Sequence, residues 1–175
     1  QAGITQRIEK QSLIFNPMEE NEALITRFYT AFKMGEPEKM AACYADNVEF
    51  EDPGFGPLKG PEVSAMWAML VGRSKGNLEI VFFGITATDN KVTAQWEAKY
   101  PFGKNKRPVH NKITANFVIE NGKIVKHIDT FDFHKWAGMA LGPMGKLFGN
   151  TGFFKKKLRK KVRGMLHHYM QKQAA

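Results

Sequence analysis

The chain has 175 residues, of which 43% are hydrophobic and 12% aromatic, enough to form one domain around a single core. Its single cysteine, Cys43, excludes an intramolecular disulfide and a cysteine-cluster metal site. No apolar run approaches the roughly 20 residues that cross a bilayer, and the first residues lack the apolar stretch of a secretory signal. These features predict a soluble, cytoplasmic protein.

The net charge of +9 comes from one end of the sequence. From Lys146 onward there are nine Lys or Arg residues and no Asp or Glu, whereas the preceding part has 17 basic and 17 acidic residues. Met18 resembles a natural start just before the first helix. We therefore interpret residues 1–17 as an extension, 18–135 as one domain, and 136–175 as a Gly- and Met-rich connection with a basic helix.

Three helices are expected in the first half of the domain. Apolar residues at positions 24, 25, 28 and 32 have the spacing of an amphipathic helix that ends near Gly35. Pro37 and Pro61 each suit the first turn of a further helix, over 36–46 and 60–73. Between these two helices, residues 48–52 form a short extended segment.

After residue 77 the apolar pattern changes to the two-residue period of a strand. Four strands are expected at 78–88, 91–100, 110–119 and 124–133, with hairpin turns at 89–90 and 120–123. Helices followed by an antiparallel meander predict an α+β domain in which the helices cover one face of a curved sheet, forming a cone.

Three stretches carry a resemblance to a known family: "RFYTAFKMGEPEKMAACYADNVEFEDP", "GPLKGPEVSAMW" and "ENGKIVKHIDTFD". In this order they resemble the SnoaL-like and ketosteroid-isomerase-like branch of the NTF2-like superfamily, over residues 18–135. The resemblance implies a cone of helices on a curved antiparallel sheet, and a homodimer paired through the sheets. It leaves the reaction open, because the superfamily includes isomerases, cyclases, dehydratases, epoxide hydrolases and non-catalytic binders.

Asp52 is the first candidate catalytic residue. It follows the apolar residues Val48 and Phe50 on one face of the extended segment, and Pro53 restricts its backbone to an extended conformation. A partly desolvated carboxylate there would have a raised pKa and could act as a base near neutral pH. In the isomerases that the segment resembles, the matching aspartate shuttles a proton. The alternative is a turn aspartate that caps nearby backbone amides.

The resemblance also argues against steroid isomerisation itself. Phe28 stands where the family's oxyanion-hole tyrosine would be, and Tyr29 lies about 100° farther round the helix. The second oxyanion donor maps onto Ala115, which cannot donate a hydrogen bond. An enolate would therefore lack the two donors that stabilise it in those enzymes.

His127 and Asp129 offer a second pair of catalytic candidates. According to the resemblance, Val125, His127, Asp129, Phe131 and Phe133 face the pocket. Alternate residues on a strand lie roughly 7 Å apart, so Asp129 could tune the titration of His127. In the opposite register Ile124, Ile128 and Thr130 would face the core, and periodicity does not distinguish the two.

Further pocket candidates share the apolar faces of the helices and strands, where they could equally be plain core. They are Phe28, Trp67, Trp96, Tyr100, Asn111, Ile113, Ala115, Phe117 and Phe131. No metal is expected, because Asp132 points away from His127 and Asp129 and one strand cannot converge all three on an ion. No glycine-rich nucleotide loop is present, and no cofactor is expected.

In the basic tail, apolar residues recur every three or four positions from 154 to 169, with seven charges between 155 and 163. Such a helix could bind an anionic membrane or a nucleic acid, or its apolar side could dock on its own subunit or on a second one. Gly164 and the lack of aromatics on the basic face argue against a dedicated nucleic-acid module.

These features lead to three functional hypotheses. The first is a protein that binds a small, mainly apolar molecule and performs cofactor-independent proton transfer of isomerase, cyclase or dehydratase type, with Asp52 as base. The second is a non-catalytic carrier or sensor on the same fold. The third is a peripheral membrane or interaction protein directed by its tail.

Overall fold

The computed structural model describes residues 16–174, so most of the predicted extension over 1–17 lies outside the described residues. The elements are α1 (Pro17–Met34), α2 (Pro37–Ala41), β1 (Tyr44–Glu51), β2 (Leu58–Lys59), α3 (Pro61–Ser74), β3 (Glu79–Thr88), β4 (Lys91–Phe102), β5 (Arg107–Glu120), β6 (Lys123–Thr130), α4 (Phe133–Leu141), α5 (Pro143–Phe148) and α6 (Gly152–Gln173).

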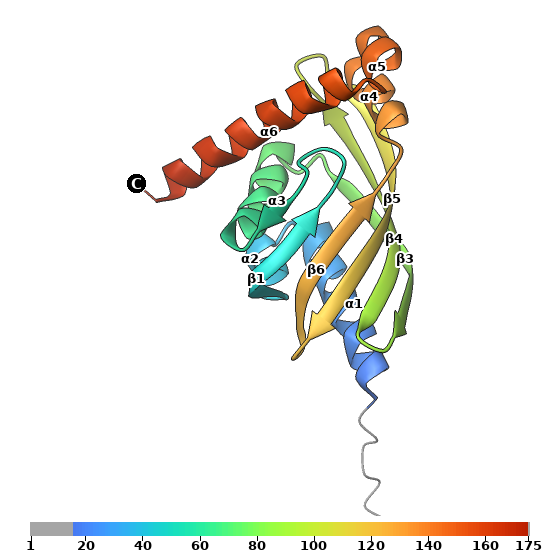
Figure 1. Ribbon diagram of the computed structural model, residues 1–175, viewed down its shortest axis with the longest axis vertical. Helices are drawn as coiled ribbons and strands as arrows, with labels where there is room; N and C mark the ends of the chain where they lie inside the picture. The colour runs from blue at the N-terminus through green and yellow to red at the C-terminus, as the bar shows by residue number, and fades with distance from the viewer. Residues whose placement is uncertain (1–15, 175) are drawn as a thin grey trace, which may run out of the picture.

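One curved sheet of six strands forms the body, in the order β2-β1-β6-β5-β4-β3 (Figure 1). The four predicted strands form the expected antiparallel meander from β3 to β6. The sheet is mixed rather than purely antiparallel, because β1 pairs in parallel with β6 and β2 adds to the outer edge of β1. The predicted α+β class, with helices on a curved sheet, is confirmed, although the sheet does not close.

Local signals account for where the helices begin and end. Pro17 begins α1, the Asn16 side chain accepts a hydrogen bond from the Met18 amide, and Gly35 ends the helix at a φ of 71°. The expected helix over 36–46 is wrong in its second half. α2 ends at Ala41, and Tyr44 instead begins β1, where it lies opposite Ile124 of β6. This long-range pairing overrides the local helical pattern.

The end of the last strand also differs from the prediction. β6 ends at Thr130, and the Asp132 side chain caps α4 by accepting a hydrogen bond from the Lys135 amide at 2.9 Å. Phe131 therefore lies in a connection and Phe133 in a helix, rather than on a strand. An aspartate at a helix N-cap explains why the strand pattern stops there.

The Gly- and Met-rich connection folds into the helices α4 and α5. Gly145 makes this possible, because a Cβ at that position would fall 1.8 Å from the Ala137 carbonyl oxygen. From α5 the chain runs into α6, which crosses the molecule and packs over α3 (Figure 1). The apolar side of α6, including Val162, Met165 and Leu166, joins the main core, so this side of the helix docks on its own chain.

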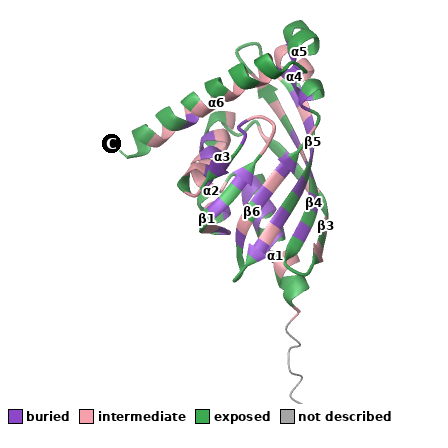
Figure 2. Ribbon diagram, in the orientation of Figure 1, coloured by how far each residue is buried: buried purple, intermediate pink, exposed green. Residues whose placement is uncertain are grey.

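Buried residues line the inner faces of the strands and the facing sides of α1 and α3 (Figure 2). The alternation is regular along β5, where odd-numbered residues from Val109 to Ile119 are buried. Most of α5 and the outer side of α6 remain exposed. The sheet and the helices thus enclose one main core, and a second, smaller apolar cluster lies between α4 and the end of the sheet.

Candidate functional site

The inner face of β6 carries two buried polar side chains, His127 at 0% exposure and Asp129 at 4%. Their neighbours across the ladder are Phe117 and Ala115 of β5. A register shift between Val118 and Ile119 lets Ile124 face the core too. This irregularity explains why apolar residues occur at both odd-numbered and even-numbered positions of β6.

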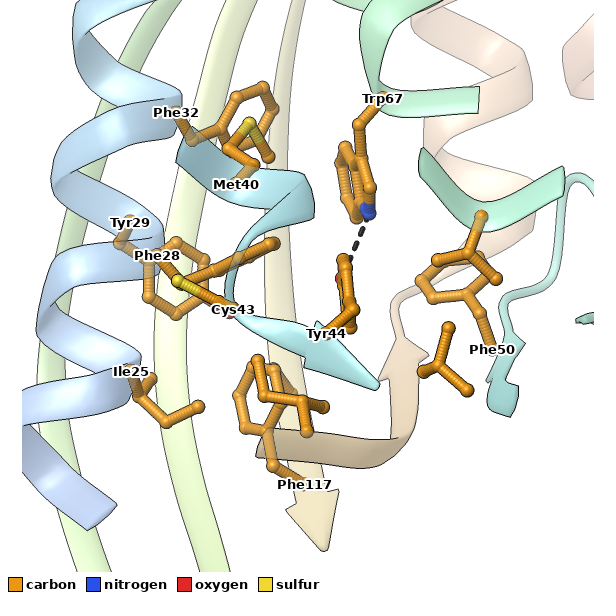
Figure 3. Packing of buried hydrophobic residues seen from close by; sticks show 14 of the residues in the cluster. Ile25, Phe28, Tyr29, Phe32, Met40, Cys43, Tyr44, Phe50, Trp67 and Phe117 are labelled. Carbon is orange, nitrogen blue, oxygen red and sulfur yellow. Dashed lines mark hydrogen bonds between the residues drawn. The ribbon is translucent and has the colours of Figure 1, made fainter. Parts of the chain in front are cut away.

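His127 belongs to a chain of hydrogen bonds across the interior. The Trp67 indole N–H donates to the Tyr44 hydroxyl at 2.9 Å, and this hydroxyl lies 2.8 Å from His127 Nδ1. Figure 3 shows Tyr44 and Trp67 joined by the first of these bonds. On the other side of the ring, His127 Nε2 lies 3.0 Å from Asp129 Oδ1, which also accepts from the Trp96 indole at 3.3 Å.

An indole only donates, so the Tyr44 oxygen accepts from Trp67. A carboxylate only accepts, so in the neutral imidazole Nε2–H donates to Asp129 Oδ1 and Nδ1 accepts from the Tyr44 hydroxyl. Burial raises the pKa of Tyr44 well above its ordinary value, with a smaller contribution from the charge of Asp129, and this keeps the hydroxyl protonated.

Aromatic rings fill the interior around His127, and Figure 3 shows four of them, Phe28, Phe50, Trp67 and Phe117. Phe117 is the nearest, with ring centroids 4.2 Å apart, and Phe28, Phe50 and Trp67 also pack against the imidazole. Of the predicted pocket residues, the buried ones are Phe28, Trp67, Trp96, Asn111, Ile113, Ala115 and Phe117. Tyr100 and Phe131 are only half-buried, and both pack against the apolar residues of α4. The end of the cone at which α4 lies is called here the open end.

Asp52 lies one residue beyond the end of β1 and is half-buried. The parallel register pairs Phe50 with His127 and Glu51 with Ile128, so the next residue along each strand is Asp52 and Asp129 respectively. Asp52 also begins a tight turn, in which its Oδ1 accepts from the Phe55 amide at 2.5 Å and its carbonyl accepts from the Gly56 amide at 3.0 Å. The capping bond expected for a turn aspartate is therefore present.

Burial raises the pKa of the Asp52 carboxyl to about 7. The hydrogen bond from the Phe55 amide opposes this effect, and the negative charge of Asp129 adds to it. Near neutral pH the group therefore exists in both protonation states. That is the condition under which one carboxyl can both accept and return a proton.

Tyr29 is a polar residue that was not predicted to take part in the site. α1 buries a wide face that includes both Phe28 and Tyr29, so the one-residue offset does not turn Tyr29 away from the interior. Its hydroxyl is fully buried and has no hydrogen-bond partner among the described residues. Burial raises the pKa of Tyr29 well above the usual range, and the charge of Asp129 raises it further, so the phenol stays a donor.

The open end of the cone is partly covered by α4, whose Trp136 indole donates to the Tyr100 hydroxyl at 2.8 Å. Burial raises the pKa of Tyr100, and the charge of Asp52 contributes in the same direction. A surface cavity of about 580 Å³ opens beside Tyr100, bounded also by Leu78, Val109 and Met139. Asp52, His127 and Asp129 are not part of its lining.

Within residues 16–174, no three His, Cys, Asp or Glu side chains gather in a way that could hold a metal ion. Asp132, the third residue considered for such a site, is engaged in capping α4. In the same stretch of chain, no helix combines the length and the apolar character needed to cross a bilayer.

A comparison with known protein families identifies the family of this chain. The family described as the SnoaL-like domain matches residues 25–127, which is more than half of the chain. The chain belongs to the SnoaL-like family. This match spans α1 through most of β6 and includes Asp52, Tyr29 and His127. A comparison with curated protein sequences finds no significant match.

Solved structures share the NTF2-like fold at low sequence identity. Bal32a, from a soil-derived mobile gene cassette, is 21% identical, with 71% of this chain and 99% of that chain covered and a TM-score of 0.64. An LEH-like epoxide hydrolase from M. tuberculosis is 19% identical over 78% and 100% of the two chains, with a TM-score of 0.58. TerC, co-crystallised with polyporic acid, is 14% identical over 70% and 98%, with a TM-score of 0.61. At these identities the likeness establishes the fold only.

Proposed function

We propose that this SnoaL-like protein binds a small, mainly apolar molecule with a carbonyl or hydroxyl group at the open end of its cone. Asp52 then moves a proton on that molecule without a cofactor. The observation that carries this proposal is the position of Asp52 at the end of β1, where burial raises its pKa to about 7. A reaction of isomerase, cyclase or dehydratase type needs a base of this strength near neutral pH.

The surrounding groups suit complementary roles in such a reaction. Asp129 accepts both of its described hydrogen bonds through Oδ1, so its other oxygen receives no bond from residues 16–174. With His127 it forms a coupled pair one strand away from Asp52. The unpartnered Tyr29 hydroxyl would supply a hydrogen-bond donor in place of those missing at Phe28 and Ala115.

The ligand would lie toward the open end, because aromatic side chains already fill the interior around His127. Tyr100 links this region to the surface, since it borders the surface cavity and its pKa responds to the charge of Asp52. Structures with this fold include an epoxide hydrolase and a protein co-crystallised with polyporic acid. They support a small organic ligand as the class of molecule that this chain binds.

The test combines NMR titration of Asp52 and His127 with proton exchange on a panel of steroid-like and polyketide-like ketones. We expect Asp52 to titrate near pH 7, to shift when a ketone binds, and to catalyse exchange of the hydrogens beside the carbonyl with solvent deuterium. Asp52→Asn should abolish the exchange, whereas Asp46→Asn, at an exposed position of the same strand, should leave it unchanged. Exchange that survives Asp52→Asn would rule out Asp52 as the base.

A non-catalytic carrier or sensor is the second candidate, and the apolar residues Phe28 and Ala115 at the family's oxyanion positions favour it. Under that function, ligand affinity is measurable, Asp52→Asn leaves it nearly intact, and no ketone exchanges its hydrogens.

We also propose that the protein is cytoplasmic and forms a homodimer through its sheets. Val81 and Phe83 of β3, each 46% exposed, support the dimer, because pairing would bury them. Analytical ultracentrifugation of the wild type and of Phe83→Glu would test it, since loss of the dimer is expected only in the variant.

A further inference from the structure

We propose that the end of the molecule formed by α5 and the start of α6 binds the surface of an anionic lipid bilayer. It would do so by combining a row of exposed lysines with a cluster of exposed apolar side chains. This inference does not depend on a ligand or a reaction in the cone.

The charge comes from one side of α6. Lys156, Lys157, Lys160 and Lys161, called here the lysine row, are all exposed. They follow Phe153 by three, four, seven and eight residues, so all five side chains share one face of the helix. No acidic residue occurs in the sequence after Asp132, so no carboxylate on α5 or α6 neutralises the row.

The apolar cluster lies where α5 leads into α6. It consists of side chains that a water-exposed surface rarely gathers in one place, and we call it the apolar tip: Met144 at 60% exposure, Leu147 at 71%, Phe148 at 42% and Phe153 at 79%. Figure 1 shows α5 and the start of α6 together at one end of the molecule, away from the start of α1. Phe153 belongs to both features, because it is exposed at the head of the face that carries the lysine row.

The opposite side of α6 explains why the lysine row is free to bind something else. Val162, Met165 and Leu166 pack into the main core, and Phe154 and Leu158 pack against α4. Arg163 donates to the Pro57 carbonyl at 2.8 Å, which also holds the helix to the body. The helix is therefore fixed with its apolar side inward, and it presents the lysines outward without needing to refold.

The combination of the two features favours a membrane over a nucleic acid. A nucleic acid would use the lysines but would leave Leu147 and Phe153 in water, since it offers no apolar layer for them. An anionic bilayer offers phosphate and other acidic headgroups to the lysine row, and acyl chains to the apolar tip. The strength of surface binding rises both with the apolar area that enters the bilayer and with the electrostatic attraction to anionic lipids.

The experiment is co-sedimentation of the full chain with two kinds of vesicle: phosphatidylglycerol mixed with phosphatidylcholine, and phosphatidylcholine alone. We expect binding to the anionic vesicles, weakened by added salt, and little binding to the neutral ones. The double variants Leu147→Glu/Phe153→Glu and Lys156→Glu/Lys160→Glu should each reduce binding at least about tenfold, since each lysine near such a surface changes affinity about fivefold. The circular dichroism of bound protein should match that of free protein.

Matched controls use exposed residues elsewhere on the chain. Met34→Glu places a charge at another exposed apolar position, and Lys33→Glu/Lys91→Glu makes the same charge change away from α6. These variants should bind anionic vesicles like the wild type. Equal binding to both kinds of vesicle, or equal losses in the controls, would overturn the proposal. So would binding of a short RNA or DNA duplex, through the same lysines, by a protein that ignores vesicles.

Discussion

The two carboxylates of the site, Asp129 on β6 and Asp52 after β1, lie on neighbouring strands but have different surroundings. Asp129 is almost fully buried and accepts hydrogen bonds from an imidazole and an indole, both held in place by packed aromatic rings. Asp52 is half-buried, is held by the amides of its own turn and has a pKa near 7. The difference suggests a division between a fixed, structural network and a group that is free to exchange its proton.

The largest effect should come from breaking the fixed network at its centre. His127→Leu removes the partner of both Tyr44 and Asp129 in a fully buried position, and leaves a carboxylate with half of its described hydrogen bonds. We expect a loss of about 3–5 kcal/mol in the free energy of unfolding, because a buried polar network is being left incomplete. Urea denaturation followed by circular dichroism measures this loss.

His110→Leu is the matched control for this variant. His110 lies 2.6 Å from Glu97 on the outer face of the sheet, and its side chain is 41% exposed. Solvent-exposed pairs of this kind contribute little, so we expect a change within about 1 kcal/mol. Similar losses in the two variants would mean that the interior network has no special role.

The second-largest effect is a pH dependence of the stability that arises from Asp52. The folded-state pKa of about 7 lies above the ordinary value of 3.8, so the folded protein takes up a proton between these two values that the unfolded chain does not. The stability of the wild type should therefore fall as the pH rises from about 4 to about 7, and the full penalty should be present above 7.

Asp52→Asn removes this penalty while keeping an oxygen that can accept from the Phe55 amide. We expect the variant to be more stable than the wild type by about 1–3 kcal/mol at about pH 8, a value reduced from the full shift because the group is partly exposed. The advantage should disappear at about pH 4. Guanidinium denaturation across this range measures it, and Asp46→Asn should show no such trend. A constant difference at all pH values would contradict the raised pKa.

The sequence predicted the body of this fold because its local signals agree with one another. Strand periodicity and the turn at Asn121–Gly122 located the meander, and the apolar spacing before Gly35 and the proline at position 61 located two helices. The sequence did not predict the parallel pairing of β1 with β6, because the partners are more than 70 residues apart and nothing local encodes it. For the same reason it extended α2 into β1.

The sequence indicated which residues of the site share the inner faces of the helices and strands, but it did not indicate how their side chains contact one another. Alternation and the family resemblance pointed to Asp52, His127 and Asp129, but alternation alone left two registers for β6. The register shift at Val118–Ile119 accounts for that ambiguity. The hydrogen bond from Tyr44 to His127 joins residues 83 positions apart, and no pattern in the sequence indicated it. Tyr29 was set aside because an ideal helical wheel made the buried face of α1 too narrow.

The smallest effect concerns two buried tyrosines with opposite surroundings. The Tyr44 hydroxyl has two hydrogen-bond partners, whereas that of Tyr29 has none among the described residues. Tyr44→Phe should therefore cost about 1–2 kcal/mol, while Tyr29→Phe should be neutral or stabilise the protein by up to about 1 kcal/mol, because it removes a buried hydroxyl that lacks a partner. Thermal and urea unfolding of the two variants measure the difference. A loss in Tyr29→Phe as large as that in Tyr44→Phe would mean that the Tyr29 hydroxyl is already bonded in solution, through a buried water for example. It would then not be a free donor for a ligand carbonyl, and the non-catalytic function would gain support.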